Sequence, residues 1–311
     1  MITERIDAIT KIPPDYRSTL PPCPKSVKVE LTAVCDFKCF FCATSQGLRK
    51  AGNMKFELLE TILRDMREAG VEEIGLFYLG ESMLYKRLAD AVALAKDIGF
   101  PYIFLTTNGR MATHLRVEAV IKAGLDSLKF SFNWADREQC EEVTGVDAFE
   151  QVVKNIITAK AIRDEVEAET GHRCGLYASS IKYDGAQQRK MERAVANIRA
   201  YVDEHYWLPL YNQGGFTPGA GGKETLAGNV GRLEAMRDPL PCWAVFTEGH
   251  VTYDGKLAAC CFDHDGRFDM GDLTTTPFMQ AWHSQRFQDL RAANLSQDVT
   301  GTACEGCIAY A

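Results

Sequence analysis

Three cysteines near the start of the chain stand at a spacing that suits iron–sulfur chemistry. Cys35, Cys39 and Cys42 form a C-x3-C-x2-C group directly after an apolar run at residues 26–32. A structural zinc ion takes four protein ligands, and an iron–sulfur cubane also takes four cysteines. Three thiolates with no histidine nearby would therefore leave one coordination position open. The alternatives are a zinc knuckle completed by a distant ligand, and buried thiols that bind nothing.

Five further cysteines gather in the last seventy residues. They are Cys242, Cys260, Cys261, Cys304 and Cys307. Gly255 stands between the first two in a C-x12-G-x4-C spacing, and Cys261 directly follows Cys260. Together with the final C-x2-C pair, four thiolates would satisfy a cubane completely. A structural zinc ribbon with four cysteine ligands is the alternative.

Strand and helix patterns alternate through the middle of the chain and would position the first cysteine group. The β-rich runs are residues 26–32, 73–79, 102–107, 127–132, 175–180 and 205–210, and the helix-period stretches are 56–69, 84–98, 115–123, 149–167 and 187–202. This alternation predicts an α/β fold with a parallel sheet, either doubly wound or a closed or partial barrel. After it come a Gly-rich loop or substrate cover at 212–222, a hairpin around Asp254-Gly255 and a helix at 277–294.

Composition limits the classes of partner and location. The 311 residues are 46% hydrophobic and 25% charged, which is ordinary for a chain with a real core. A formal charge of -7 argues against binding nucleic acid or an anionic membrane through bulk electrostatics. No apolar run approaches the ~20 residues that span a bilayer, and the charged N-terminus has no secretion signal. We therefore expect a cytoplasmic protein with no nucleic-acid and no membrane partner.

The first cysteine group resembles the defining motif of the radical S-adenosylmethionine (SAM) superfamily. That motif is CxxxCxΦC with an aromatic residue at Φ, and Phe41 fills this place. The resemblance implies a partial (β/α)6 TIM-type barrel and a [4Fe-4S] cluster held by three cysteines and by SAM. It also implies reductive cleavage of SAM to a 5′-deoxyadenosyl radical, which abstracts hydrogen from the substrate. A reduced flavodoxin- or ferredoxin-type protein would supply the electron.

The same resemblance assigns SAM contacts to polar residues that follow successive strands. Residues 78–84 look like the family's GGEPLL-type segment, although Leu79 replaces its first glycine and Ser82 its proline. Gly80 would allow close backbone approach there, and Glu81 would receive the ammonium group of SAM. The full set of expected cofactor-binding residues is Phe41, Gly80, Glu81, Asn108, Ser131, Asn133 and Ser179.

The second cysteine group resembles the SPASM and twitch auxiliary-cluster domains of radical SAM enzymes. The resemblance divides the chain into an N-terminal extension (1–23), a radical SAM partial barrel (24–225) and an auxiliary-cluster domain with a hairpin and a helix (226–311). The chain ends four residues after Cys307, before the further cysteines of a full SPASM domain. We therefore expect the shortened twitch form, with one auxiliary [4Fe-4S] cluster on Cys242, Cys260, Cys304 and Cys307.

A fully ligated auxiliary cluster favours electron transfer over substrate binding. We expect oxidation of an alcohol in a small sugar- or aminocyclitol-like metabolite, as in the twitch-type dehydrogenases that the chain resembles. The base candidates are Lys182, Tyr183, Asp184, His205 and His264, and Cys261 is a candidate thiol hydrogen donor. The alternatives are epimerisation or crosslinking of a ribosomally made peptide and, in another class, a non-catalytic zinc-binding module.

Overall fold

The computed structural model describes residues 1–183, 185–208, 213, 216, 240–305 and 307. Within them, nine strands form one sheet in the order β6-β5-β4-β3-β2-β1-β7-β8-β9. Neighbours from β6 to β7 pair in parallel, and β8 and β9 add to the β7 edge in antiparallel fashion. The strands are β1 (Ser26–Val29), β2 (Glu73–Gly75), β3 (Tyr102–Thr107), β4 (Ser127–Ser131), β5 (Gly175–Ile181), β6 (Glu204–Leu208), β7 (Glu248–Val251), β8 (Lys256–Ala258) and β9 (Asp269–Asp272).

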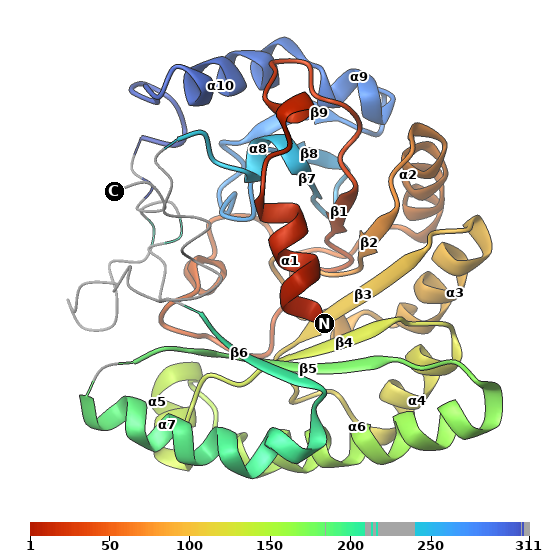
Figure 1. Cartoon of the computed structure of the whole chain (residues 1–311), viewed down its shortest axis with the longest axis vertical. Coiled ribbons are helices and arrows are strands. Elements are labelled where there is room, and N and C mark those ends of the chain that lie inside the picture. The colour runs from red at the N-terminus through yellow and green to blue at the C-terminus, as the bar shows by residue number, and fades with distance from the viewer. Residues whose placement is uncertain (184, 209–212, 214–215, 217–239, 306, 308–311) are drawn as a thin grey trace.

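Helices cover the outer side of the curved sheet, where α2, α3, α4, α6 and α7 are seen in Figure 1. In α2 the buried residues Leu59, Ile62, Leu63 and Met66 recur at helical spacing, so one face of the helix is apolar. The helices are α1 (Ile2–Thr10), α2 (Phe56–Ala69), α3 (Leu88–Ile98), α4 (His114–Lys122), α5 (Arg137–Thr144), α6 (Phe149–Thr170), α7 (Gly185–Ile198), α8 (Ala244–Thr247), α9 (Phe278–Trp282) and α10 (Gln285–Leu295).

The order of the strands decides between the two α/β architectures that the sequence left open. The first six strands lie side by side in chain order, whereas a doubly wound sheet reverses its order at a switch point. Winding in one direction curves the sheet towards a barrel, as Figure 1 shows. The predicted α/β partial barrel is therefore confirmed. The loops that leave the carboxyl ends of its parallel strands meet on one side, where barrels of this type place their reactive groups.

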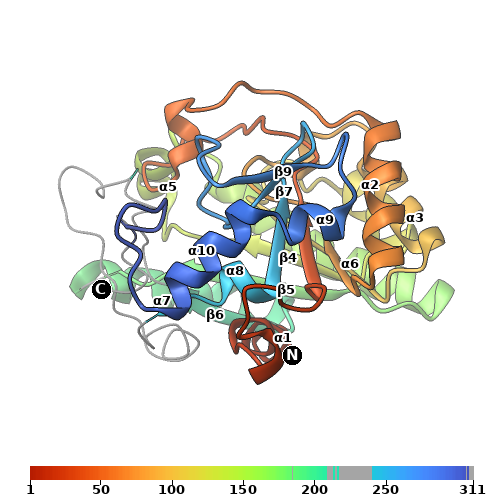
Figure 2. The same ribbon diagram turned by 90° about the horizontal axis from the view of Figure 1, so that it is seen from above.

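The predicted hairpin is present, and it extends the barrel sheet. Strands β7 and β8 are antiparallel around a turn in which Gly255 has a φ of 85°, a value that favours glycine. Strand β7 also pairs in parallel with β1, with Ser26 opposite Glu248. The sequence predicted this strand only as one half of the hairpin, because no local pattern indicates that it also pairs with β1. Seen from above, α9 and α10 lie over this part of the sheet (Figure 2).

Several helices differ from the sequence-based prediction. The segment at 84–98 begins its α-helix only at Leu88, because residues 82–84 form a 3-10 turn. The segment at 277–294 is two helices, since the side chain of Ser284 caps α10 by accepting a hydrogen bond from the Phe287 N–H at 3.4 Å. Helix α1 was not predicted. It contacts the amino ends of the strands, where Arg5 pairs with Glu73 at 2.5 Å and lies over the ring of Tyr102.

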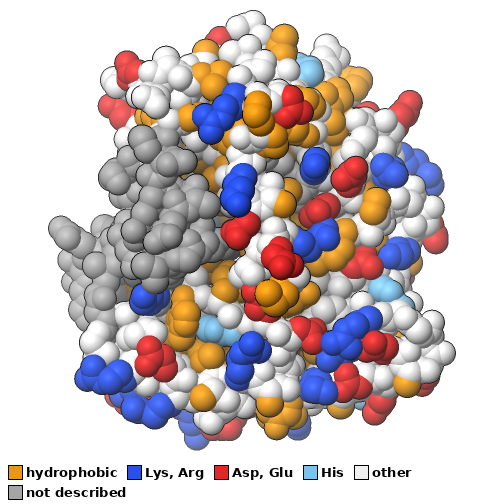
Figure 3. Space-filling model, viewed as in Figure 1, with side chains coloured by type: hydrophobic (Ala, Val, Ile, Leu, Met, Phe, Trp, Pro, Cys, Tyr) orange, Lys and Arg blue, Asp and Glu red, His pale blue; other side chains and the backbone are white. Residues whose placement is uncertain are grey.

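The exposed face seen in Figure 3 carries acidic and basic side chains interspersed over its described part. No helix among the described residues is long and apolar enough to cross a membrane.

Candidate functional site

The three cysteines of the first group lie together in the loop after β1. All three are half-buried. Burial raises the pKa of the Cys35 thiol to about 12, and nearby Glu81, Asp36 and then Cys42 add to this effect. Burial also raises the pKa of Cys39, and the proximity of Cys42 and then of Cys35 raises it further. Thiolates this close repel one another and need a shared positive centre, so the donor set fits a cluster with iron at its corners.

Helix α5 supports this loop through its last carbonyl groups. The N–H of Lys38 donates to Thr144 O at 2.8 Å, and the N–H of Phe40 donates to Val143 O at 3.1 Å. The helix was not predicted, although its sequence carried a signal. Asp136 accepts a hydrogen bond from the Gln139 N–H at 2.9 Å, which is the D-x-x-Q pattern of a helix start.

The turn after β3 holds the cysteine loop from another direction. The side-chain amide of Asn108 donates to Asp36 Oδ1 at 2.7 Å, between the first two cysteines. The Arg110 guanidinium lies 3.4 Å from Asp36 Oδ2. Asn108 was expected to contact SAM. In the structure both polar atoms of its side chain form hydrogen bonds to other residues of the chain, since Asn108 Oδ1 also accepts from the Arg110 N–H at 2.9 Å.

Glu81 and Gly80 connect the end of β2 to both neighbouring loops. The buried Glu81 carboxylate accepts from the N–H groups of Asn108 at 2.6 Å and Met83 at 2.9 Å, and from the Thr107 hydroxyl at 2.8 Å. Burial raises the pKa of Glu81 to about 7, against the effect of these hydrogen bonds. A Cβ at Gly80 would stand 2.0 Å from Thr32 O, so only glycine allows this approach to the cysteine loop.

Three of the remaining residues expected to bind the cofactor lie at or near the carboxyl ends of β4 and β5, and the fourth, Phe41, lies in the cysteine loop. Ser131 is half-buried at the end of β4 and stands opposite the buried Ser179 of β5. Asn133 is buried, and its side-chain oxygen accepts from the Ile181 N–H at 3.0 Å. Phe41 packs edge-on against Phe40 at a ring distance of 5.2 Å.

Cys242 and Cys260 of the second cysteine group lie beside α10 and the β7–β8 hairpin, and Cys304 and Cys307 follow α10 along the chain. Cys242 is near Cys260, and Asn294 of α10 accepts from its N–H through Oδ1 at 3.1 Å. Cys304 is buried, and its carbonyl accepts from the Cys307 N–H at 3.0 Å. A hydrogen bond to Cys261, followed by burial, raises the pKa of Cys260. These thiols could serve as cluster ligands.

The adjacent Cys261 lies near a charged group of residues inside the barrel. The bond from Cys260 lowers its pKa against the effect of burial, and His250 and Lys28 lower it further. Lys28 Nζ stands 2.7 Å from Glu248 Oε2, and His250 Nε2 stands 3.1 Å from the same oxygen. Burial opposes ionisation of Glu248, but Lys28 and His250 outweigh it and lower its pKa to about 2.

Tyr78 joins the end of β2 to the second cysteine group. Its hydroxyl donates to Cys260 O at 2.6 Å, and its ring lies 5.2 Å from that of His250. No sequence pattern indicated this contact, because the two residues are 182 positions apart.

The structure gives the candidate general bases different hydrogen-bond partners. His205 Nε2 stands 2.9 Å from Ser180 Oγ, and burial lowers the His205 pKa to about 4. The Tyr183 hydroxyl donates to Asn133 O at 2.9 Å, and the Lys182 N–H donates to Leu208 O. His264 Nδ1 stands 3.2 Å from Thr44 Oγ1, beside the first cysteine group. Asp184 lies outside the described residues.

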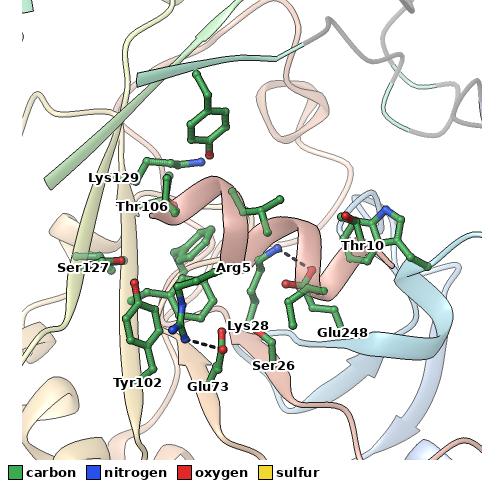
Figure 4. Close-up of a pocket in the computed structure, with 18 residues that line it drawn as sticks. Arg5, Thr10, Ser26, Lys28, Glu73, Tyr102, Thr106, Ser127, Lys129 and Glu248 are labelled. Carbon is green, nitrogen blue, oxygen red and sulfur yellow. Dashed lines mark hydrogen bonds and ion pairs between the residues drawn. The ribbon is translucent and has the colours of Figure 1, made fainter. Parts of the chain in front are cut away.

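A cavity of about 700 Å³, part of it open to solvent, lies between α1 and the concave face of the sheet. Figure 4 shows Lys28 with Glu248 and Arg5 with Glu73 in its wall, together with Thr106 and Ser127. Among the described residues, no three His, Cys, Asp or Glu side chains converge as ligands of a single metal ion.

Comparison with known proteins identifies the class. The profile of the radical SAM superfamily matches residues 29–168, and that of SPASM, an iron-sulfur cluster-binding domain, matches residues 242–308. A protein of Sulfurisphaera tokodaii named "Probable GTP 3',8-cyclase" is 30% identical over 289 residues, covering 82% of this chain and 86% of that protein. One of the same name from Saccharolobus islandicus is 30% identical over 135 residues, 43% of each chain.

Solved structures agree in fold. "BtrN in complex with AdoMet and 2-DOIA" aligns with a TM-score of 0.60 and 17% identity over 91% of this chain and 92% of that one. "Streptococcus suis SuiB bound to precursor peptide SuiA" aligns with a TM-score of 0.69 and 15% identity over 94% of this chain and 71% of that one. The chain thus belongs to the radical SAM superfamily. It is an enzyme with a SPASM-type domain, and its cofactors are SAM, a [4Fe-4S] cluster and an auxiliary cluster.

Proposed function

We propose that the chain is a radical SAM dehydrogenase that converts a secondary alcohol of a small sugar- or aminocyclitol-like molecule to a ketone. Bound SAM supplies the 5′-deoxyadenosyl radical on reductive cleavage at the cluster of Cys35, Cys39 and Cys42. A hydrogen atom leaves the carbinol carbon, a proton leaves the hydroxyl, and the auxiliary cluster accepts the remaining electron. In sum, alcohol and SAM give ketone, methionine, 5′-deoxyadenosine and a proton.

The observation that carries this proposal is the thiol set at the second site. Cys242 and Cys260 are close together, and Cys304 and Cys307 are joined by a backbone hydrogen bond. Four thiolates would satisfy every iron of a cubane, which suits an electron acceptor rather than a substrate-binding cluster. Tyr78 ties this site to the segment that leads into Glu81. The similarity to BtrN, bound to AdoMet and 2-DOIA, extends over nearly both chains and supports the same substrate class.

Two alternatives have specific observations in their favour. The relative from Sulfurisphaera tokodaii favours a nucleotide substrate, since it is named for cyclisation of GTP. SuiB, whose title includes a precursor peptide, favours peptide modification. For any of these substrates, we further propose a reduced flavodoxin- or ferredoxin-type donor and a cytoplasmic location, because low-potential clusters need a reducing compartment.

One experiment tests the three candidates together. Anaerobically reconstituted protein is given dithionite, SAM and, in separate reactions, cyclitols and aminocyclitols including 2-DOIA, GTP, and a synthetic peptide mixture. Substrate-dependent 5′-deoxyadenosine and a product that has lost two hydrogens are expected with a cyclitol. Consumption of GTP alone, or a change in peptide mass alone, would overturn the alcohol assignment.

A further inference from the structure

His264 lies where the two cysteine-bearing loops meet. It follows Cys260 by four residues, and its Nδ1 contacts Thr44, which follows Cys42 by two. The rings of His264 and Phe216 are nearly perpendicular, with a centroid distance of 6.4 Å. Only 4% of the residue is exposed. A molecule that binds to this imidazole would therefore lie close to both the radical-forming site and the auxiliary site.

The hydrogen bonds of Thr44 determine which nitrogen of His264 carries the proton. A hydroxyl has one hydrogen, and a backbone carbonyl can only accept. Thr44 Oγ1 donates its hydrogen to Leu79 O at 3.1 Å. Towards His264 Nδ1, at 3.2 Å, the same oxygen can then only accept. The neutral imidazole is therefore protonated at Nδ1 and has its lone pair at Nε2.

The lone pair at Nε2 has no hydrogen-bond donor among the described residues, although the atom is buried. Burial, and then Arg49 and Arg267, lower the pKa of His264 to about 4, so the ring is neutral at pH 7. A buried acceptor without a partner costs about 1–3 kcal/mol. A ligand hydroxyl would remove this cost. By contrast, Ser180 already engages Nε2 of His205, the other histidine of the candidate set, which is half-buried and whose pKa is also lowered to about 4.

We propose that Nε2 of His264 accepts the hydroxyl of the substrate, first as a hydrogen-bond acceptor and then as the base that takes its proton. This inference rests on the proposed alcohol oxidation. The carbinol carbon loses a hydrogen atom to the 5′-deoxyadenosyl radical. The O–H bond then breaks towards Nε2 as the C=O bond forms, and the unpaired electron passes to the auxiliary [4Fe-4S] cluster. The position of His264 places proton removal beside both sites.

The tautomer can be measured without a substrate. In holoenzyme labelled with 15N-histidine at pH 7, we expect His264 to be neutral and protonated at Nδ1, with its signal assigned by the H264N variant. His205 is the internal control. Ser180 Oγ donates to Phe132 O, so it accepts from Nε2–H of His205, which must be the opposite tautomer. A proton on Nε2 of His264 would overturn the inference.

The catalytic role is tested with the alcohol that wild-type enzyme oxidises. H264N keeps a side-chain donor for Thr44 and removes Nε2. We expect ketone formation to fall at least about a hundredfold, the scale of a lost general base, while deuterium from the carbinol carbon still enters 5′-deoxyadenosine. H172N is the matched control, because His172 Nε2 bonds to Leu125 O before the amino end of β4.

The outcomes separate the two proposals. Wild-type rates of ketone formation in H264N would refute the role of His264 and leave the dehydrogenase assignment intact. If wild-type enzyme oxidises no alcohol, the proposed function fails and the role of His264 fails with it, whichever tautomer the spectra show.

Discussion

The two cysteine-bearing regions are held in different ways. The loop with Cys35, Cys39 and Cys42 is fixed by the end of β2, the turn after β3 and the last carbonyls of α5. The C-terminal region joins the barrel through the pairing of β7 with β1, through Tyr78, and through the contact of His264 with Thr44. A cysteine loop held by three segments suits radical formation, because the reacting groups must be held in a fixed geometry. Because different contacts hold the two cysteine groups, we expect loss of the second group to leave the first in place.

Loss of the first cysteine group should have the largest effect. Replacement of Cys35, Cys39 and Cys42 by alanine removes the ligands of the proposed SAM-binding cluster, and 5′-deoxyadenosine formation should fall to background. Chromatography of reactions with SAM and dithionite measures this. C23A is the control, since among the described residues the Cys23 thiol bonds only to Pro24 O. Deoxyadenosine formation by the triple variant would disprove the assignment of the site.

Loss of the final cysteine pair should abolish only the second half of the reaction. In C304A/C307A, SAM cleavage should persist while ketone formation stops, because the electron has no acceptor. Iron content should fall from about eight to about four per chain. If this variant still makes ketone at the wild-type rate, the two regions do not divide the work in this way.

Glu248 tests the pairing of β7 with β1, which joins the two regions. Its carboxylate is buried between Lys28 and His250, so E248Q should lower the free energy of unfolding by about 3 kcal/mol. Its pKa falls from 4.5 to about 2, so its contribution is complete above pH 4.5 and is lost as the pH falls towards 2. Urea unfolding across this range should show a shallower acid dependence in E248Q. The exposed pair of Glu60 with Arg64 is the control, and E60Q should change stability by less than about 1 kcal/mol.

Tyr78 should give the smallest effect. Y78F removes one hydrogen bond to Cys260 O, worth about 1 kcal/mol. It should alter the electron paramagnetic resonance spectrum of the auxiliary cluster and leave that of the first cluster unchanged. Y253F also removes one tyrosine hydrogen bond, to Lys50 O, and should change neither spectrum. A change in the first cluster alone would contradict the assignment of Tyr78 to the second region.

Local patterns predicted most of the barrel. The apolar stripe of α2 and the run of β3 have the bounds that their periodicity indicated, because each buries one continuous face. Helix α5 is short and polar, so periodicity missed it, although Asp136 and Gln139 carry a start signal. Asn108 and Asn133 were expected to contact SAM, and the structure engages their side chains with Asp36 and Ile181.

The sequence alone was enough to indicate radical SAM chemistry, because this chemistry is carried by features of short segments. These are the cysteine spacings, the α/β alternation and the aromatic residue Phe41. Only the tertiary structure decided that β7 continues the sheet beside β1, that Tyr78 reaches Cys260, and that His264 meets Thr44. The reason is physical. These contacts join residues about 180 to 220 positions apart, and a hydrogen bond between such residues depends on how the whole barrel closes, which no local pattern encodes.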